Sequence, residues 1–299
     1  MGFKLRKNES ASSGIRRVAR ELIDDSILRI ARGKGEIGET VHELRKQLKK
    51  LRALFRLVRG GLGEDVFDRD NGAARDLGRR LSAARDAAVR VSALDTLQKS
   101  YPEEFPSEEI APLRRRLLSR QRAALRRVRS DGSLAAVARE LGELRLRVRA
   151  WPVFEAGFAC LEPGMRRVYR QGRDAEAEAY ASGTDEAFHE WRKRAKDFRY
   201  HVELLEPLWP EVMKDVEKAL HDLTDRLGDD HDLADLRRAL STSPRLTRGV
   251  RAVPRVLELA DRRRSKLQAD ARPIGSRIYG EKPRAFSSRI AGYWNAWRS

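Results

Sequence analysis

The feature that most constrains this chain is an internal repeat. Three blocks recur in the same order, at offsets of 150, 147 and 146 residues: Gly14–Arg20 with Gly164–Arg170, Val41–Arg52 with Phe188–Arg199, and Leu81–Asp86 with Leu227–Asp232. Constant order and nearly constant spacing indicate a duplicated unit of about 150 residues. We therefore predict one repeated domain over 10–299, with a first unit at 10–150 and a second at 151–299 that includes a C-terminal helix.

Each unit is expected to be helical. Ala, Leu, Arg and Glu dominate, and alternating β-branched runs are absent. Helical periodicity recurs near 14–32, 39–59, 73–98, 107–129, 133–150, 154–181, 185–206, 210–241, 250–271 and 283–298. Glycine- and proline-containing breakers separate these stretches. The sequence predicts an all-α fold built from a pair of antiparallel helical bundles, with equivalent helices facing each other across a pseudo-two-fold axis.

One repeated helix carries two opposed stripes. Its apolar stripe consists of Val41, Leu44, Leu48, Leu51, Phe55 and Val58, and its basic stripe of His42, Arg45, Lys46, Lys49, Arg52 and Arg56. Basic side chains three and four residues apart repel one another, so ordinary solvated helices interleave them with glutamate. The stripe therefore indicates a site for an anion, with a solvated basic face as the plain alternative.

The second copy repeats the pattern and weakens that alternative. Its basic positions are His189, Arg192, Lys193, Lys196 and Arg199, opposite Phe188, Trp191, Ala195, Phe198 and Val202. The helix before each copy adds arginines, at Arg16, Arg17 and Arg20 in the first unit and at Arg166, Arg167, Arg170 and Arg173 in the second. So extended a surface suits a linear polyphosphate or a nucleic-acid backbone better than a small substrate.

Composition agrees with an anionic partner. The chain has 63 Lys and Arg against 45 Asp and Glu, a net charge of +18, and 50 of the basic residues are arginine, whose planar fork of donors matches phosphate oxygens. The 40% hydrophobic content is too high for a disordered polycation. No apolar run reaches the roughly 18 residues of a membrane span, and no signal peptide is evident. A single cysteine, Cys160, excludes an internal disulfide framework and a Cys-rich zinc site. We expect a cytoplasmic protein with no membrane partner.

The repeated motifs resemble the CHAD family, the conserved-histidine α-helical domain. The resemblance lies in His42–Lys46, His189–Tyr200, Gly164–Arg173, Leu227–Leu233 and the tail from Tyr279 to Trp297, and it covers roughly 10–299. It implies two four-helix bundles related by pseudo-two-fold symmetry, around a basic central groove or pore. It also implies binding of inorganic polyphosphate, often at polyphosphate granules, without catalysis and without a cofactor.

The resemblance transfers the family's basic positions onto the two repeated helices, with two departures. Asp197 stands where the first copy has Lys50, and His231 stands where the first copy has Arg85, which puts that second position in doubt as a ligand contact. Some relatives carry a fused triphosphate-tunnel domain marked by a Glu-x-Glu-x-Lys strand. The most similar segment of this sequence, Glu176–Tyr180, falls in a predicted helical stretch and lacks the lysine.

The candidate ligand contacts follow from the stripes and the resemblance together. They are Arg16, Arg20, His42, Arg45, Lys46, Lys49, Arg52, Arg56, Arg166, Arg170, Arg173, His189, Arg192, Lys193, Lys196 and Arg199. No residue is assigned a catalytic or metal-binding role. Oligomeric state and chain-length preference stay open.

Two rival functions remain. A general polyanion or nucleic-acid binder would also use basic stripes, although no known nucleic-acid motif is present and few aromatic residues accompany the stripes. A metal phosphohydrolase could use His221, Asp222, His231 and Asp232, with Asp225, Asp229 and Asp230 between them, or His42 and His189 as paired ligands. Ligands of that kind normally come from several helices, and these acids are better explained as partners of nearby arginines.

Overall fold

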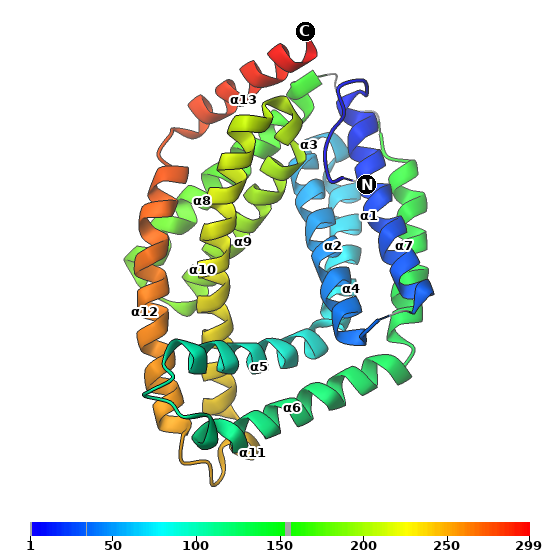
Figure 1. Ribbon diagram of the computed structural model, residues 1–299. Helices are drawn as coiled ribbons and strands as arrows, with labels where there is room; N and C mark the ends of the chain where they lie inside the picture. Colours follow the sequence, from blue (N-terminus) through cyan, green and yellow to red (C-terminus); the bar gives the residue numbers. More distant parts are fainter. Residues whose placement is uncertain (1, 34, 153–156) are drawn as a thin grey trace.

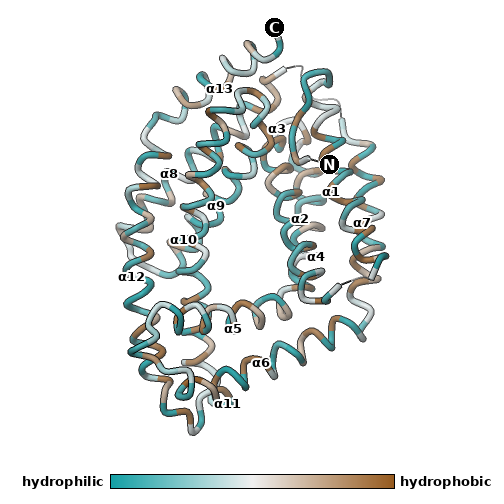
Figure 2. The backbone as a smooth tube through the Cα atoms, in the orientation of Figure 1, coloured by the Kyte–Doolittle hydropathy of each residue, from teal (hydrophilic) through white to brown (hydrophobic). Residues whose placement is uncertain are grey.

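Helices make up nearly all of the chain. The computed structural model describes residues 2–33, 35–152 and 157–299, and within these ranges it contains helices and no strand. The prediction of an all-α fold is confirmed. Hydrophilic and hydrophobic residues alternate along the helices (Figure 2). None of the helices in the described ranges is long and apolar enough to cross a membrane.

Most helices coincide with the predicted stretches, but the helix Glu64–Arg80 begins before the stretch predicted at 73–98, and the helix Val253–Ile278 continues beyond the one predicted at 250–271. The first half contains α1 (Ala11–Arg32), α2 (Ile37–Leu57), α3 (Arg59–Leu62), α4 (Glu64–Arg80), α5 (Ser82–Ser100), α6 (Ser107–Ser130) and α7 (Ser133–Arg149). The second half contains the 3₁₀ turns η1 (Gly157–Cys160) and η2 (Glu206–Leu208), and the helices α8 (Glu162–Ser182), α9 (Asp185–Leu204), α10 (Pro210–Thr242), α11 (Pro244–Thr247), α12 (Val253–Ile278) and α13 (Pro283–Arg298). The start of the stretch predicted at 154–181 lies partly outside the described residues, and the described helix there begins at Glu162.

One predicted helix is divided. The stretch expected at 73–98 is broken at Leu81, where α4 ends and α5 turns across the base of the molecule (Figure 1). Leu81 is fully buried, and neither proline nor glycine occupies the break, so local sequence carries no breaker signal. In an unbroken helix the Gly78 carbonyl would accept a hydrogen bond from the amide four residues on. Here the Arg45 guanidinium of α2 donates to it.

Local signals fix the start of α9, the second basic helix. Gly183 ends α8 in the left-handed conformation, with φ 66°, which glycine adopts without strain. Thr184 then caps α9, because its hydroxyl accepts a hydrogen bond from the Ala187 amide at 3.2 Å.

Two hydrophobic cores hold the helices, and each draws on both halves of the sequence. The larger core joins side chains of α1, α2, α4, α7, α8, α9, α13 and the first part of α10. The smaller core joins α5 and α6 with α11, α12 and the end of α10. In Figure 1, α9 and α10 lie on one side of the molecule and α2 and α4 on the other, and α5 crosses between the two sides near the base. The division at residue 150 describes the repeat in the sequence, and the pseudo-two-fold bundles stay a prediction.

The two repeats approach each other closely where α8 crosses the end of α2. A β-carbon at Gly164 would lie 1.8 Å from the Leu57 carbonyl oxygen, so only glycine permits this approach. Nearby, Arg167 donates to the carbonyl of Arg56. The buried His201 ring lies 2.8 Å from the carbonyl of Ala53. These contacts fix α2 relative to the second repeat.

Candidate anion-binding site

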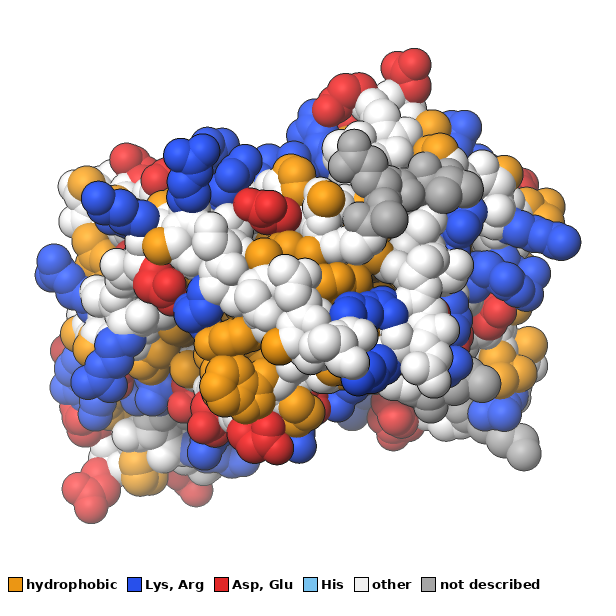
Figure 3. All heavy atoms as spheres, turned by 90° about the horizontal axis from the view of Figure 1, so that it is seen from above, with side chains coloured by type: hydrophobic (Ala, Val, Ile, Leu, Met, Phe, Trp, Pro, Cys, Tyr) orange, Lys and Arg blue, Asp and Glu red, His pale blue; other side chains and the backbone are white. Residues whose placement is uncertain are grey.

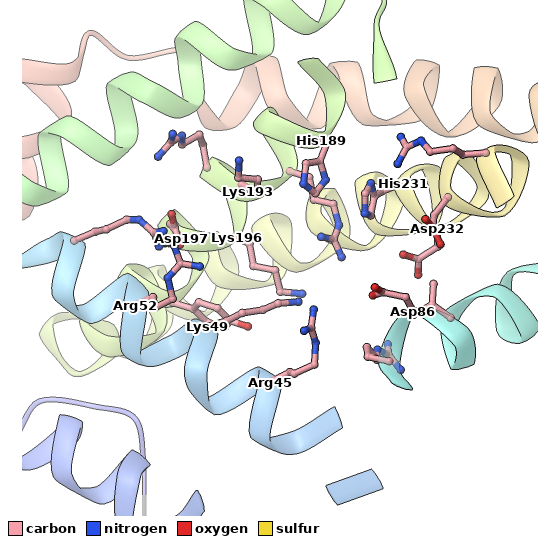
Figure 4. Close-up of a pocket in the computed structure, with 18 residues that line it drawn as sticks. Arg45, Lys49, Arg52, Asp86, His189, Lys193, Lys196, Asp197, His231 and Asp232 are labelled. Carbon is pink, nitrogen blue, oxygen red and sulfur yellow. Dashed lines mark hydrogen bonds and ion pairs between the residues drawn. The ribbon is translucent and has the colours of Figure 1, made fainter. Parts of the chain in front are cut away.

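Two cavities open between α2 and α9, of about 560 Å³ and about 610 Å³. The first is bordered also by α5 and α10, and the second by α5, α10 and the N-terminal segment. Six residues line both cavities: Arg45, Lys49, Arg85, Arg192, Lys196 and Tyr200. We call these six the girdle. Figure 4 shows Arg45, Lys49 and Lys196 converging there from opposite helices. The two cavities therefore meet at five cations and one tyrosine.

The apolar stripes explain why the basic stripes face the cavities. Every residue predicted for the two apolar stripes is buried, and Trp191 of α9 and Leu44 of α2 have no exposed surface. Burying one side of each helix in the larger core leaves the opposite side on the cavity.

Eleven of the sixteen candidate residues line a cavity. They are His42, Arg45, Lys46, Lys49, Arg52, Arg56, His189, Arg192, Lys193, Lys196 and Arg199. All eleven belong to α2 and α9, the two helices that carry the stripes.

The other five candidates line neither cavity. Arg20, Arg170 and Arg173 are exposed on α1 and α8, Arg16 donates to the carbonyl of Trp151 at 3.1 Å, and Arg166 lies 3.6 Å from Glu162. α1 and α8 pack their apolar sides into the hydrophobic core, and these five arginines lie outside the buried residues of the two helices. The structure does not bring them together with the girdle.

The two girdle lysines have strongly lowered pKa values. Burial, followed by repulsion from Arg192, Lys196, Arg45 and Arg85, lowers the pKa of Lys49 to about 7. Burial, followed by repulsion from Arg192 and Arg199, lowers the pKa of Lys196 to about 8. The Lys49 side chain is open to the water in the cavity, yet protein and four other cations surround it at longer range. A bound anion would therefore favour the protonated form of both lysines.

Three arginines of the site also have lowered pKa values. Burial and then repulsion from Arg56 lower the pKa of Arg52 to about 10, and burial lowers the pKa of Arg192 and of Arg45. The Nε atoms of Arg45 and Arg192 are buried without a hydrogen-bond partner in the described part of the chain. Buried donors of this kind cost free energy unless water or a ligand oxygen accepts from them.

Acidic side chains lie along one side of the first cavity, on α5 and α10. Asp235 pairs with Arg90 at 2.7 Å, whereas Asp86 and Asp232 line the cavity without an ion pair among the described residues (Figure 4). Burial raises the pKa of both Asp86 and Asp232. At the other end Asp197 pairs with Arg56 at 3.1 Å, and burial still raises its pKa. The cavity is thus basic at the girdle and mixed along α5 and α10.

The histidines of the two repeats occupy different places. His42 is exposed in the second cavity, 3.8 Å from Glu43, whereas His189 stacks on His231 in the first, with ring centroids 4.1 Å apart. Burial lowers the pKa of His189 to about 4 and that of His231 to about 3, so both rings are neutral near pH 7. The structure does not bring His42 and His189 together, as a shared metal ion would require.

The other proposed metal ligands are likewise separated. His221 lies 3.0 Å from Asp225 at the second cavity, whereas His231 lines the first, and Asp230 is paired with Arg264 at 3.0 Å. Within the described ranges, no group of three His, Cys, Asp or Glu side chains is arranged to hold a metal ion.

Several cavity residues escaped the sequence analysis. The most important is Arg85, which belongs to the girdle. The last two residues of each copy of the third repeated block line the first cavity: Arg85 and Asp86, and His231 and Asp232. The doubt about Arg85 came from its replacement by histidine in the second copy, but both residues line the same cavity. Arg238 follows His231 by seven residues on α10, so helical spacing could have found it.

Comparison with known proteins places the fold. The chain resembles the crystal structure of the CHAD domain from the plant Ricinus communis, with 18% identity, a TM-score of 0.57, and coverage of 97% of this chain and 94% of that chain. It also resembles PptA from Streptomyces chartreusis, with 16% identity, a TM-score of 0.60, and coverage of 91% and 100%. At these identities the similarity shows the fold alone. No curated protein matches the sequence.

The sequence itself matches a family. The model of the CHAD domain family matches residues 16–241, which include α2, α9 and the whole of the girdle. Since the match spans well over half of the chain, and since the fold agrees with it, this protein belongs to the CHAD domain family.

Proposed function

We propose that the protein binds inorganic polyphosphate along the girdle and its two cavities, without catalysis. The observation that carries the proposal is the girdle itself. Its five cations come from α2, α5 and α9, border both cavities, and form no ion pair among the described residues. Membership of a family associated with polyphosphate binding supports the same ligand.

A linear phosphate chain suits this arrangement physically. Each repeat of the chain carries a charge, so a chain passing the girdle would relieve several repulsions at once and accept from the unpaired Nε donors. Because the two cavities meet at the girdle, the ligand would contact both signature helices together. Association with polyphosphate granules would follow from the same contacts.

Nucleic acid is a weaker candidate for this cavity. Single strands are usually held by aromatic side chains on which bases stack. Among the described residues that line the two cavities, Tyr200 is the sole tyrosine, phenylalanine or tryptophan, and its ring is buried. Trp191, Phe188 and Phe198 belong to the core, as expected.

Charge reversal at two equivalent positions tests the proposal. The variant Arg45→Glu/Arg192→Glu should lose at least about 100-fold in affinity for long-chain polyphosphate, about 2.7 kcal/mol, because it places two anions in the girdle. The matched control, Arg20→Glu/Arg170→Glu, makes the same change at repeated arginines outside the cavities and should stay within about threefold. Displacement of labelled polyphosphate at two salt concentrations measures both.

Arg45 also holds the Gly78 carbonyl, so the helicity of each variant is checked by circular dichroism. If the first variant unfolds, Lys49→Gln/Lys196→Gln replaces it, since neither lysine makes a hydrogen bond within the described residues. Equal losses in the cavity variant and the control would refute the assignment of the site. Release of phosphate from polyphosphate in the presence of Mg²⁺ or Mn²⁺ would contradict a non-catalytic role.

A further inference from the structure

The most basic helix of the protein lies outside the cavities. α6 carries eight arginines and two acids, a net charge of +6, which is one third of the charge of the whole chain. By comparison, α2 has six basic and two acidic residues, and α9 has five of each. α6 runs along the base of the molecule and contributes no residue to either cavity (Figure 1).

Three of these eight arginines contact neighbouring groups. Arg114 pairs with Asp95 at 2.7 Å, and Arg116 and Arg120 donate to neutral oxygens of the α11 region. The remaining five are exposed and make no side-chain hydrogen bond or ion pair in the described part of the chain: Arg115, Arg122, Arg126, Arg127 and Arg129. The nearby carboxylate of Asp131 accepts from the Ser133 amide at 2.9 Å.

Helical spacing arranges the arginines in two rows. Arg115, Arg122, Arg126 and Arg129 lie seven, four and three residues apart, which places them on one side of the helix over about 21 Å. Arg116, Arg120 and Arg127 form the second row. The buried residues Ile110, Leu113, Leu117 and Val128 occupy the opposite side.

The second row continues onto α11. Arg116 donates to the carbonyls of Leu246 and Arg248, both at 2.8 Å, and so holds that segment against α6. Arg116, Arg245 and Arg248 then surround a hollow of about 400 Å³ together with Pro244. We call the two rows and this hollow the α6 surface.

We propose that the α6 surface binds duplex nucleic acid through its phosphate backbone, without sequence preference. The exposed arginines, which are the whole of the first row and Arg127 of the second, can neutralise phosphates and release counterions, which supplies affinity that is independent of sequence. A duplex is too wide for cavities of about 560 Å³ and about 610 Å³, but it can lie on a helix that faces solvent.

The composition of α6 excludes two other occupants. It contains no Phe, Tyr or Trp, so it offers no stacking platform for the bases of a single strand. The large hydrophobic side chains exposed in the described ranges are Leu28, Leu146 and Trp209, and none belongs to α6. A helix that lies in a membrane interface needs such residues. The face seen from above in Figure 3 mixes acidic, basic and apolar side chains, so it offers no comparable field.

The test uses the intact protein and a labelled DNA duplex. The variant Arg115→Gln/Arg122→Gln/Arg126→Gln/Arg129→Gln should weaken duplex binding at least about 30-fold at low salt. It should also reduce the salt dependence of log K by about four, one for each phosphate that is no longer neutralised. Polyphosphate binding should stay within about threefold. The matched control, Arg20→Gln/Arg32→Gln/Arg170→Gln/Arg173→Gln, removes the same charge from exposed positions elsewhere and should retain duplex binding.

Several outcomes would overturn the inference. Unchanged duplex binding in the α6 variant would show that these four arginines do not bind the duplex. Equal losses in the α6 variant and in the control would show that duplex binding depends only on the net charge of the protein. Duplex binding that disappears in Arg45→Glu/Arg192→Glu and survives in the α6 variant would place DNA at the cavity. Binding to phosphatidylglycerol vesicles without binding to the duplex would identify a membrane surface. Polyphosphate binding to the cavity variants is measured separately, so the two proposals can fail independently.

Discussion

The cavity and the α6 surface are both rich in basic residues, but their surroundings differ. α9 carries no net charge and still supplies Arg192 and Lys196 to the girdle, whereas α6 carries +6 and supplies nothing. In the cavity a few cations are crowded and partly removed from water. On α6 the five arginines without a side-chain partner in the described chain are exposed to water, so solvent and salt screen their mutual repulsion. We infer that a high net charge on an exposed helix favours non-specific binding of a polyanion, whereas partly buried, crowded cations favour specific binding.

The same difference decides which charges respond to their environment. At 0.1 M salt, interactions between exposed arginines and charges more than about 10 Å away are largely screened. Arginines also keep their charge at any physiological pH. The girdle lysines are less screened and titrate in the neutral range. A ligand at the girdle is therefore expected to be sensitive to pH, and a ligand on α6 mainly to salt.

The largest effect that separates the two surfaces is thus pH dependence. Between pH 7 and pH 9, affinity for polyphosphate should fall about tenfold or more, because Lys49 and Lys196 have pKa values of about 7 and about 8 and lose their protons in this window. Binding raises these pKa values and takes up protons, so affinity falls as pH rises.

Titration calorimetry in two buffers of different ionisation enthalpy measures the affinity and the proton uptake together. Lys49→Arg/Lys196→Arg serves as the control, since arginine stays charged and should flatten the pH profile. Duplex binding at the α6 surface should change by less than about twofold over the same range. A flat profile for the unaltered protein would mean that the lysines are already protonated and do not sense the ligand.

The two surfaces also differ in how visible they were in the sequence. The amphipathic pattern of α2 and α9 predicted the fold and eleven cavity residues, because the side chains that form the core determine which side of a helix faces outward. Repetition alone does not bring a residue to the cavities, since Arg20 and Arg170 are equivalent in the repeat but are exposed and line neither cavity. Whether a repeated basic residue reaches a site depends on long-range packing, which a helical wheel does not contain.

The position of Arg85 and the lack of acidic partners for most α6 arginines in the described chain depend on tertiary contacts, which the sequence does not show. The break at Leu81 lets α5 cross the base and bring Arg85 to the girdle, and it leaves a carbonyl that Arg45 satisfies. No local residue pattern marks this break. The sequence shows the charge of α6, but which of its arginines lack an acidic partner depends on where acids such as Asp131 lie in the fold, and in the described chain Asp131 accepts from the Ser133 amide.

A smaller effect concerns stability without ligand. The pKa of Lys49 is lower in the folded protein than its ordinary value of 10.5, so folding is opposed at neutral and lower pH and becomes less opposed as pH rises from about 7 toward 10. Lys49→Met should therefore stabilise the protein at pH 7. Because Lys49 is open to water in the cavity, the expected gain is about 1 kcal/mol, or about 2 °C in Tm.

Thermal unfolding at pH 7 and pH 9 measures this gain, which should shrink at the higher pH. Arg126→Gln on α6 is the matched control and should change stability by less than about 0.5 kcal/mol, since its side chain is exposed and unpaired in the described chain. A lower Tm for Lys49→Met would mean that the lysine stabilises the empty cavity, which is the opposite of the charge argument.

The smallest effect is expected at the histidines that mark the start of each basic stripe. His189 is neutral near pH 7, with a pKa of about 4, so it brings no charge to a polyanion and offers at most one hydrogen bond. His189→Ala should therefore weaken polyphosphate binding by about threefold or less, whereas Arg192→Gln, three residues further along α9, should weaken it by about tenfold or more. Fluorescence titration at pH 7 compares the two, with His42→Ala as the equivalent change in the other cavity. A loss at His189 as large as that at Arg192 would mean that the ligand protonates the stacked His189–His231 pair. The cavity would then hold its ligand through imidazolium charge as well as through lysine and arginine.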